Sequence, residues 1–205
     1  MSAYICAMTM ELFIALISFA TVSSFTPGPN NLMLMASGTN FGFARTIPHS
    51  LGVIVGYTAM VLLVGIGLSG VFTAVPALHD VMKAFCVAYL LYLAWKIATA
   101  PPPGEGPIRA KPMTFTQAAL FQWINPKGWT MALTAASAYA VSDDFWSYAI
   151  IALVFGLIGV PSNGLWMVMG VQARRLLSNP RALRAFNIGA ALLLVGSLYP
   201  LVFSH

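Results

Sequence analysis

Apolar and polar residues alternate in blocks along this chain, so that six long apolar stretches are separated by short polar segments. An α-helix rises ~1.5 Å per residue, and each stretch therefore holds enough residues to cross a bilayer core ~30 Å thick. The polar segment 37–46 is predicted as a turn, because Gly42 and Arg45 interrupt the apolar pattern there. The pattern predicts an all-α integral membrane protein with one membrane domain over residues 1–205. The six predicted spans are 12–35, 47–72, 81–98, 115–139, 145–169 and 186–203.

Prolines interrupt the first and fourth predicted spans. Pro27, Gly28 and Pro29 fall inside the first span, and Pro126 falls inside the fourth. A proline removes a backbone donor and clashes with the preceding turn, so each helix is predicted to break there. Pro161 predicts a further interruption in the fifth span. Broken backbone at membrane depth survives only inside protein or beside a watery cavity, and secondary transporters place their substrates at such breaks.

A weak internal repeat relates the two halves of the chain. Pro27 and Pro126 break the first and fourth spans, while Gly56 and Gly156 lie in the second and fifth, and both offsets are close to one hundred residues. Three spans per repeat is an odd number, so the halves would cross the membrane in opposite directions. We therefore predict six transmembrane helices built as two inverted three-helix repeats. The predicted division is a first repeat at 1–99, a linker at 100–114 and a second repeat at 115–205.

Composition supports a membrane protein and limits the other classes. The chain is 59% hydrophobic and only 7% charged, with a mean hydropathy of +0.83, whereas soluble domains carry about 25% charged residues. The net charge of +5 lies in short gaps between apolar stretches and not in a groove with interleaved aromatic residues, so no nucleic-acid partner is predicted. Cys6 and Cys86 lack CxxC spacing, and we predict no disulfide framework, metal site or cofactor.

The basic residues predict an orientation in the membrane. If the six spans alternate, all the basic residues except Lys83 and Lys127, which lies within the fourth span, lie in or beside the first, third and fifth loops. Because cytoplasmic loops carry an excess of lysine and arginine, both termini are predicted to face outward. The basic residues on the predicted cytoplasmic side are Arg45, Lys96, Arg109, Lys111, Arg174, Arg175, Arg181 and Arg184.

Lys127 is the leading candidate for a functional side chain. A charged group near the bilayer centre costs at least ~2.5 to 3.5 kcal/mol on insertion scales and is usually functional. It would bind a substrate carboxylate, or act as a gating or proton-coupled cation. The alternatives are that Lys127 extends to an interface or ties the repeats together by bonding carbonyls freed at the breaks.

Asparagines beside the breaks are the other candidates. Asn30, Asn31 and Asn125 could hold the ammonium and carboxylate of a zwitterion, or cap the half-helices. Asn163 either completes the cavity or bonds across helices. The predicted substrate-binding residues are Asn30, Asn31, Asn125, Lys127 and Asn163. The prolines and glycine of the breaks, Pro27, Gly28, Pro29 and Pro126, are predicted to be architectural and to expose helix N-termini that favour an anionic group.

Two further titratable residues lie close to the predicted spans. His49 is predicted to be an interfacial residue at the cytoplasmic end of the second span, with proton carriage as the alternative. Glu11 is predicted at the outer surface. The spans lack the buried Asp or Glu of many proton relays, so the coupling mechanism stays open.

Rival functions fit the residue types less well. A metal or ion exporter would prefer carboxylates, thiolates or imidazoles, and Lys127 would repel a cation. A thiol-redox electron carrier needs two cysteines that can meet, but neither Cys6 nor Cys86 adjoins a break. A transporter for a small organic anion or zwitterion is therefore favoured over an enzyme.

Two motifs carry a family resemblance. Thr26-Pro27-Gly28-Pro29-Asn30 and Asn125-Pro126-Lys127-Gly128-Trp129 resemble the LysE/RhtB family of amino-acid exporters, and the similarity extends over the whole chain. Residues 93–99, Lys111-Pro112 and 115–122 look most similar to the cysteine/O-acetylserine exporter branch.

The resemblance implies efflux of a small amino acid or derivative, either cysteine/O-acetylserine-like or homoserine/threonine-like. The protein would lie in the inner membrane of a bacterium, with the lipid bilayer as its surroundings and the proton gradient as its driving force. The glycine-rich second span would permit a homodimer, but it would equally serve packing within the chain.

Overall fold

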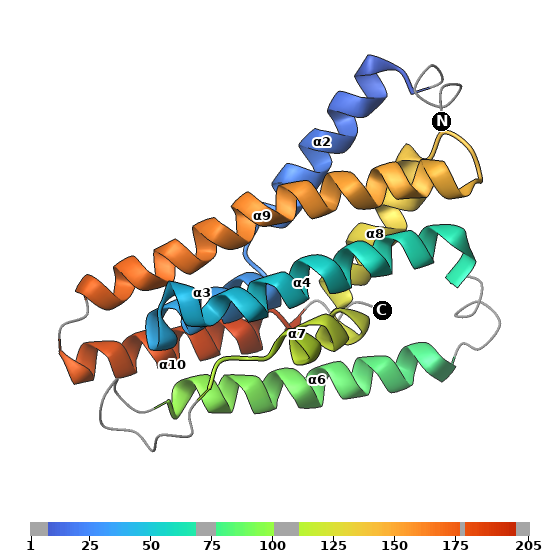
Figure 1. Ribbon diagram of the computed structural model, residues 1–205. Coiled ribbons are helices and arrows are strands. Elements are labelled where there is room, and N and C mark those ends of the chain that lie inside the picture. Colours follow the sequence, from blue (N-terminus) through green and yellow to red (C-terminus); the bar gives the residue numbers. More distant parts are fainter. Residues whose placement is uncertain (1–7, 69–76, 101–110, 177–178, 200–205) are drawn as a thin grey trace.

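The computed structural model describes residues 8–68, 77–100, 111–176 and 179–199, and every regular element among them is helical. Figure 1 shows these helices as an elongated bundle in which the long helix α9 runs beside α3 and α4. The elements are α2 (Met10–Phe25), α3 (Pro29–Phe41), α4 (Phe43–Leu63), the π-helical turn η1 (Val64–Leu68), α6 (Ala77–Ala98), α7 (Phe115–Phe121), the 3-10 turn η2 (Gln122–Ile124), α8 (Pro126–Tyr139), α9 (Phe145–Leu176) and α10 (Pro180–Gly196).

The first predicted break is present between α2 and α3. α2 ends at Phe25, Thr26 has extended backbone angles, and α3 begins with Pro29. Proline suits the first position of a helix because its missing N–H would have no partner there. The two helices meet at an angle of 51°. The Pro27 and Pro29 region therefore divides one apolar stretch into two half-helices.

The second predicted break lies between α7 and α8. α7 begins with a capping box formed by Thr114 and Gln117, and the 3-10 turn η2 follows it. Asn125 then has extended backbone angles, and α8 begins at Pro126. The fourth predicted span is thus also two helical segments.

The third predicted interruption, at Pro161, is wrong, because α9 continues through Pro161 without a break.

The predicted turn at 37–46 is shorter than expected. α3 reaches Phe41 and α4 begins at Phe43, so only Gly42 separates them, with φ +82. The polar residues of this region are satisfied by contacts inside the protein: for example, the Ser37 and Thr46 hydroxyls lie 2.9 Å apart.

Glycines allow the central helices to approach closely. A Cβ on Gly170 of α9 would collide with the Met35 carbonyl of α3, and a Cβ on Gly52 of α4 would collide with the Phe115 carbonyl of α7. Gly56 likewise faces the backbone of Ala119. Gly52 and Gly56, which belong to the second predicted span, therefore serve packing within the chain. A homodimer stays a prediction.

Three apolar clusters form the described core, the smallest being Leu34 of α3 with Trp166 and Met167 of α9. Of the two larger clusters, one joins α2, α4, α8 and α9 around Leu16, Met60 and Phe155. The other joins α6 and α10 to α3 and α7, and it contains the buried free thiol of Cys86. Cys6 lies outside the described residues.

By length and hydropathy, two described helical segments can each cross a membrane, namely Phe43–Gly67 and Phe145–Arg175. The bent pair Met10–Phe25 and Pro29–Phe41 makes a third if it counts as one span. Six crossings and inverted symmetry stay predictions. Most of the predicted linker and both termini lie outside the described residues, so the orientation also stays a prediction.

Candidate functional site

A cavity lies where the two helix breaks meet. It is bounded by the α2–α3 break, the start of α8 and the facing sides of α4 and α9. Its volume is about 60 Å³, and a water molecule needs about 10–15 Å³ on the same measure. The cavity therefore has room for several waters or for a small solute.

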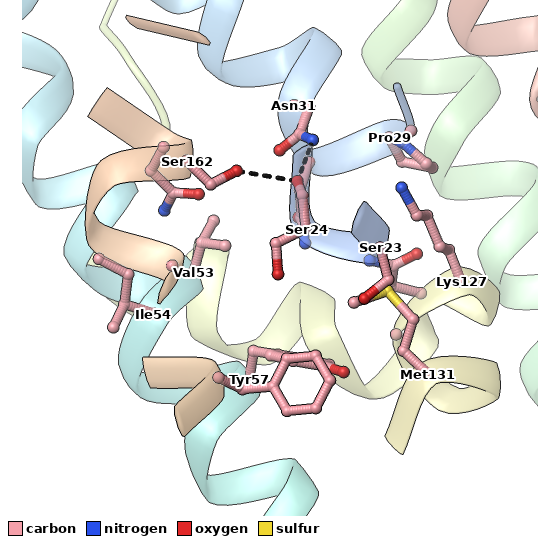
Figure 2. Close-up of a pocket in the computed structure, with 17 residues that line it drawn as sticks. Ser23, Ser24, Pro29, Asn31, Val53, Ile54, Tyr57, Lys127, Met131 and Ser162 are labelled. Carbon is pink, nitrogen blue, oxygen red and sulfur yellow. Dashed lines mark hydrogen bonds between the residues drawn. The ribbon is translucent and has the colours of Figure 1, made fainter. Parts of the chain in front are cut away.

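Lys127 joins the two breaks. Its Nζ donates hydrogen bonds to the carbonyl oxygens of Thr26, at 2.7 Å, and of Pro27, at 3.4 Å. These carbonyls follow the last turn of α2, which is the negative end of that helix dipole. Of the alternatives left open by the sequence, the structure shows the one in which the ammonium bonds carbonyls freed by the break. Lys127 also lines the cavity, with its side chain near Pro29 (Figure 2).

Gly28 provides the space that this lysine occupies. A Cβ at Gly28 would lie 2.7 Å from Cδ and 3.1 Å from Nζ of Lys127. The φ of Gly28 is −174°, which any residue can adopt. The preference for glycine is therefore steric, since a larger residue would have to displace the end of the Lys127 side chain, and it adds to the helix-breaking role predicted from the sequence.

Asn31 and Ser162 stabilise the carbonyls at the end of α2. Asn31 Nδ2 donates to the Ser24 oxygen at 2.7 Å and to the Thr26 oxygen at 2.9 Å. Ser162 Oγ, from α9, donates to the same Ser24 oxygen at 2.8 Å (Figure 2). The structure thus places the amide of Asn31 in the capping role that was one of its two predicted roles.

A reciprocal amide pair forms a second link between the breaks. Asn30 Nδ2 donates to Gln122 Oε1 at 2.8 Å, and Gln122 Nε2 donates to Asn30 Oδ1 at 3.2 Å. Gln122 is fully buried and was not predicted as a site residue. In the sequence, Gln122 could have been recognised because it is an amide side chain within an apolar stretch, three residues before Asn125.

Two buried polar atoms from residues that line the cavity have no hydrogen-bond partner among the described residues. They are Oδ1 of Asn125, whose side chain is 3% exposed, and the hydroxyl of Tyr57. Leaving a buried polar group unsatisfied costs about 1–3 kcal/mol. A ligand in the cavity that donates a hydrogen bond to Asn125 would remove that cost. Tyr57 was not predicted as a site residue, because an aromatic residue at this position of an apolar span is equally expected in the core.

Asn163 bonds across helices at the rim of this region. Its Nδ2 donates to the Ser50 carbonyl at 3.2 Å and to the Ser50 hydroxyl at 3.3 Å. The side chain also contributes to the cavity lining. The two predicted roles of Asn163 therefore coexist.

His49 is buried between helices and is not an exposed side chain, while its depth in the membrane stays a prediction. It is 1% exposed, and neither ring nitrogen has a hydrogen-bond partner among the described residues. The reason is that α4 begins at Phe43, which places His49 well inside the helix, on the face that carries Gly52 and Gly56. That face packs against α7. Glu11 is exposed in the first turn of α2.

A cavity at two proline breaks in a helical membrane protein is the arrangement in which secondary transporters place their substrates. Residues 21–198 match the family model described as LysE type translocator. The chain belongs to the LysE family, which confirms the resemblance drawn from its motifs, and it is a transporter and not an enzyme.

Among its relatives are cysteine/O-acetylserine efflux proteins of Escherichia coli (strain K12), Shigella sonnei (strain Ss046) and Shigella flexneri. Each is 31% identical to this chain over 191 residues, which cover 92% of the chain and 96% of the relative. No solved structure matches the chain.

The contact between Gly28 and Lys127 predicts how substitutions at the two positions combine. Gly28→Ala should lower the thermal unfolding midpoint in detergent, by the equivalent of about 1–3 kcal/mol, because the new methyl group overlaps the lysine stem. In a Lys127→Ala background the same substitution should cost much less, since the overlapping atoms are gone. Gly164→Ala is the control, because a Cβ there meets no atom within 4 Å. An equal loss in both backgrounds would contradict the assigned contact.

Proposed function

We propose that this protein exports cysteine, O-acetylserine or a similarly small amino acid from the bacterial cytoplasm across the inner membrane. The observation that carries the proposal is the cavity between the two proline breaks, which places the Lys127 ammonium beside two helix N-termini. The relatives, which are cysteine/O-acetylserine efflux proteins, support the substrate class. The cavity volume of about 60 Å³ favours a small solute.

The charges of the cavity suit a zwitterion. α3 and α8 both begin at the cavity, with Pro29 and Pro126, and the first N–H groups of a helix have no partner within the helix. A substrate carboxylate would be stabilised by these two positive helix ends and by Lys127. The unpartnered Oδ1 of Asn125 would accept a hydrogen bond from the substrate ammonium.

Release of the bonds between the breaks would provide the conformational step. In the proposed alternating-access cycle, six spans form two inverted repeats that rock about the cavity, with both termini outside. A substrate carboxylate would compete with the Thr26 and Pro27 carbonyls for the Lys127 ammonium. Binding would thereby weaken one contact between the repeats and favour their movement.

Coupling to the proton gradient would use His49. Among the described residues, the helices packed against α4 carry few charges: Lys127 on α8 and Arg174 and Arg175 at the end of α9. The α3 and α7 segments carry none. His49 is thus a buried imidazole with two unpartnered nitrogens, and an imidazole can take up and release a proton.

Replacement of Lys127 tests the substrate site. Lys127→Met should reduce export to the level of cells without the transporter, because the apolar side chain cannot bind a carboxylate or the carbonyls of the break. Amino acids that accumulate in the medium are measured by mass spectrometry at matched membrane levels of protein. Lys96→Met is the control, since Lys96 is exposed at the end of α6 and stacks over Tyr92. Normal export by Lys127→Met would contradict the assignment.

Replacement of His49 separates coupling from binding. In proteoliposomes, His49→Gln should lose accumulation driven by an imposed pH gradient, because glutamine cannot take up the proton. Counterflow of the same labelled amino acid, which needs no gradient, should persist at a rate close to that of the original protein. Accumulation equal to that of the unaltered protein would rule out His49 as the proton carrier.

A further inference from the structure

The cavity has two chemically different sides. Lys127, Asn125 and the break at Gly28 form the charged, polar side. The opposite side, called the apolar side below, carries Val53 and Ile54 of α4 together with the uncharged Ser162 and Asn163 of α9. In Figure 2, Lys127 and Ile54 lie at opposite sides of the cavity. An amino acid whose charged groups bind at the breaks would direct its side chain toward α4 and α9.

Gly159 of α9 lies on the apolar side, and packing does not require it to be glycine. A Cβ at Gly159 would meet only Ile54 Cγ1, at 3.5 Å, which is an ordinary van der Waals distance. By contrast, a Cβ at Gly156, one turn earlier, would lie 2.9 Å from Thr58 Oγ1, and one at Gly170 would collide with the α3 backbone. Gly156 and Gly170 are thus required for helix contact, whereas Gly159 leaves space open within the cavity.

We propose that Gly159 determines the largest substrate side chain that this transporter accepts. The inference rests on the proposed function and adds to it a specificity-determining position. A methyl group at Gly159 would occupy part of a cavity of only about 60 Å³, on the side that receives the substrate side chain. Cysteine, with its single-atom thiol, would still fit, whereas the acetyl ester of O-acetylserine would lose the space that it needs.

The test compares the two substrates in Gly159→Ala. Transport of labelled cysteine, kept reduced, and of labelled O-acetylserine is measured in proteoliposomes, and kcat/KM is obtained for each. The ratio of O-acetylserine to cysteine should fall at least about tenfold, since a change of one carbon in a pocket alters discrimination by about 10- to 200-fold. Gly164→Ala is the matched control on the same helix, because its Cβ meets no atom within 4 Å and Gly164 does not line the cavity.

A compensating variant keeps the test independent of general damage to the fold. In Gly159→Ala/Ile54→Val, loss of a carbon from the neighbouring side chain should restore part of the O-acetylserine transport. An unchanged substrate ratio in Gly159→Ala would overturn this inference while leaving the proposed function intact. If the unaltered protein transports neither these two nor any other small amino acid, the proposed function itself fails, and the assignment of Gly159 fails with it.

Discussion

The arrangement of the site depends on the hydrogen bond between the Lys127 ammonium and the carbonyls that follow α2. The helix is interrupted between Phe25 and Pro29, so these carbonyls lack helical N–H partners, and in an apolar surrounding they need other donors. Lys127, on a helix that begins about one hundred residues later, supplies a charged donor at 2.7 Å. A hydrogen bond to a charged group contributes about 1.5–3 kcal/mol. The same contact therefore satisfies the free backbone carbonyls of the break and places a positive charge beside the cavity.

The remaining polar groups divide into satisfied and unsatisfied ones, and this division separates structural from functional roles. Asn30 and Gln122 use their amides to hold the two breaks together, and Asn31 uses its amide to bond carbonyls within the first break. Asn125 Oδ1 and the Tyr57 hydroxyl have no hydrogen-bond partner among the described residues. Such groups are costly unless a ligand or a water molecule in the cavity completes them. A bound zwitterion would therefore take the place of water at these two groups.

The sequence predicted the positions of both breaks because proline acts locally, through the hydrogen bond that it removes. It did not predict that α9 passes through Pro161 intact, because packing against α3 and α4 outweighs the local preference. The burial of His49 and the pairing of Gln122 with Asn30 depend on which helices meet, and local patterns do not encode this. Gly28 was recognised, but its steric role became visible only once Lys127 lay across it.

The central claim is that substrate occupies the cavity between the breaks. It is tested most directly by placing a cysteine at Ser24, which lines the cavity, in a Cys6→Ser/Cys86→Ala background. The measured quantity is the rate of labelling by a small water-soluble thiol reagent, with and without O-acetylserine. We predict that O-acetylserine slows labelling at Ser24→Cys in a saturable manner and leaves labelling at the exposed Lys111→Cys unchanged. Equal rates at Ser24→Cys with and without O-acetylserine, in a protein that transports it, would contradict the account.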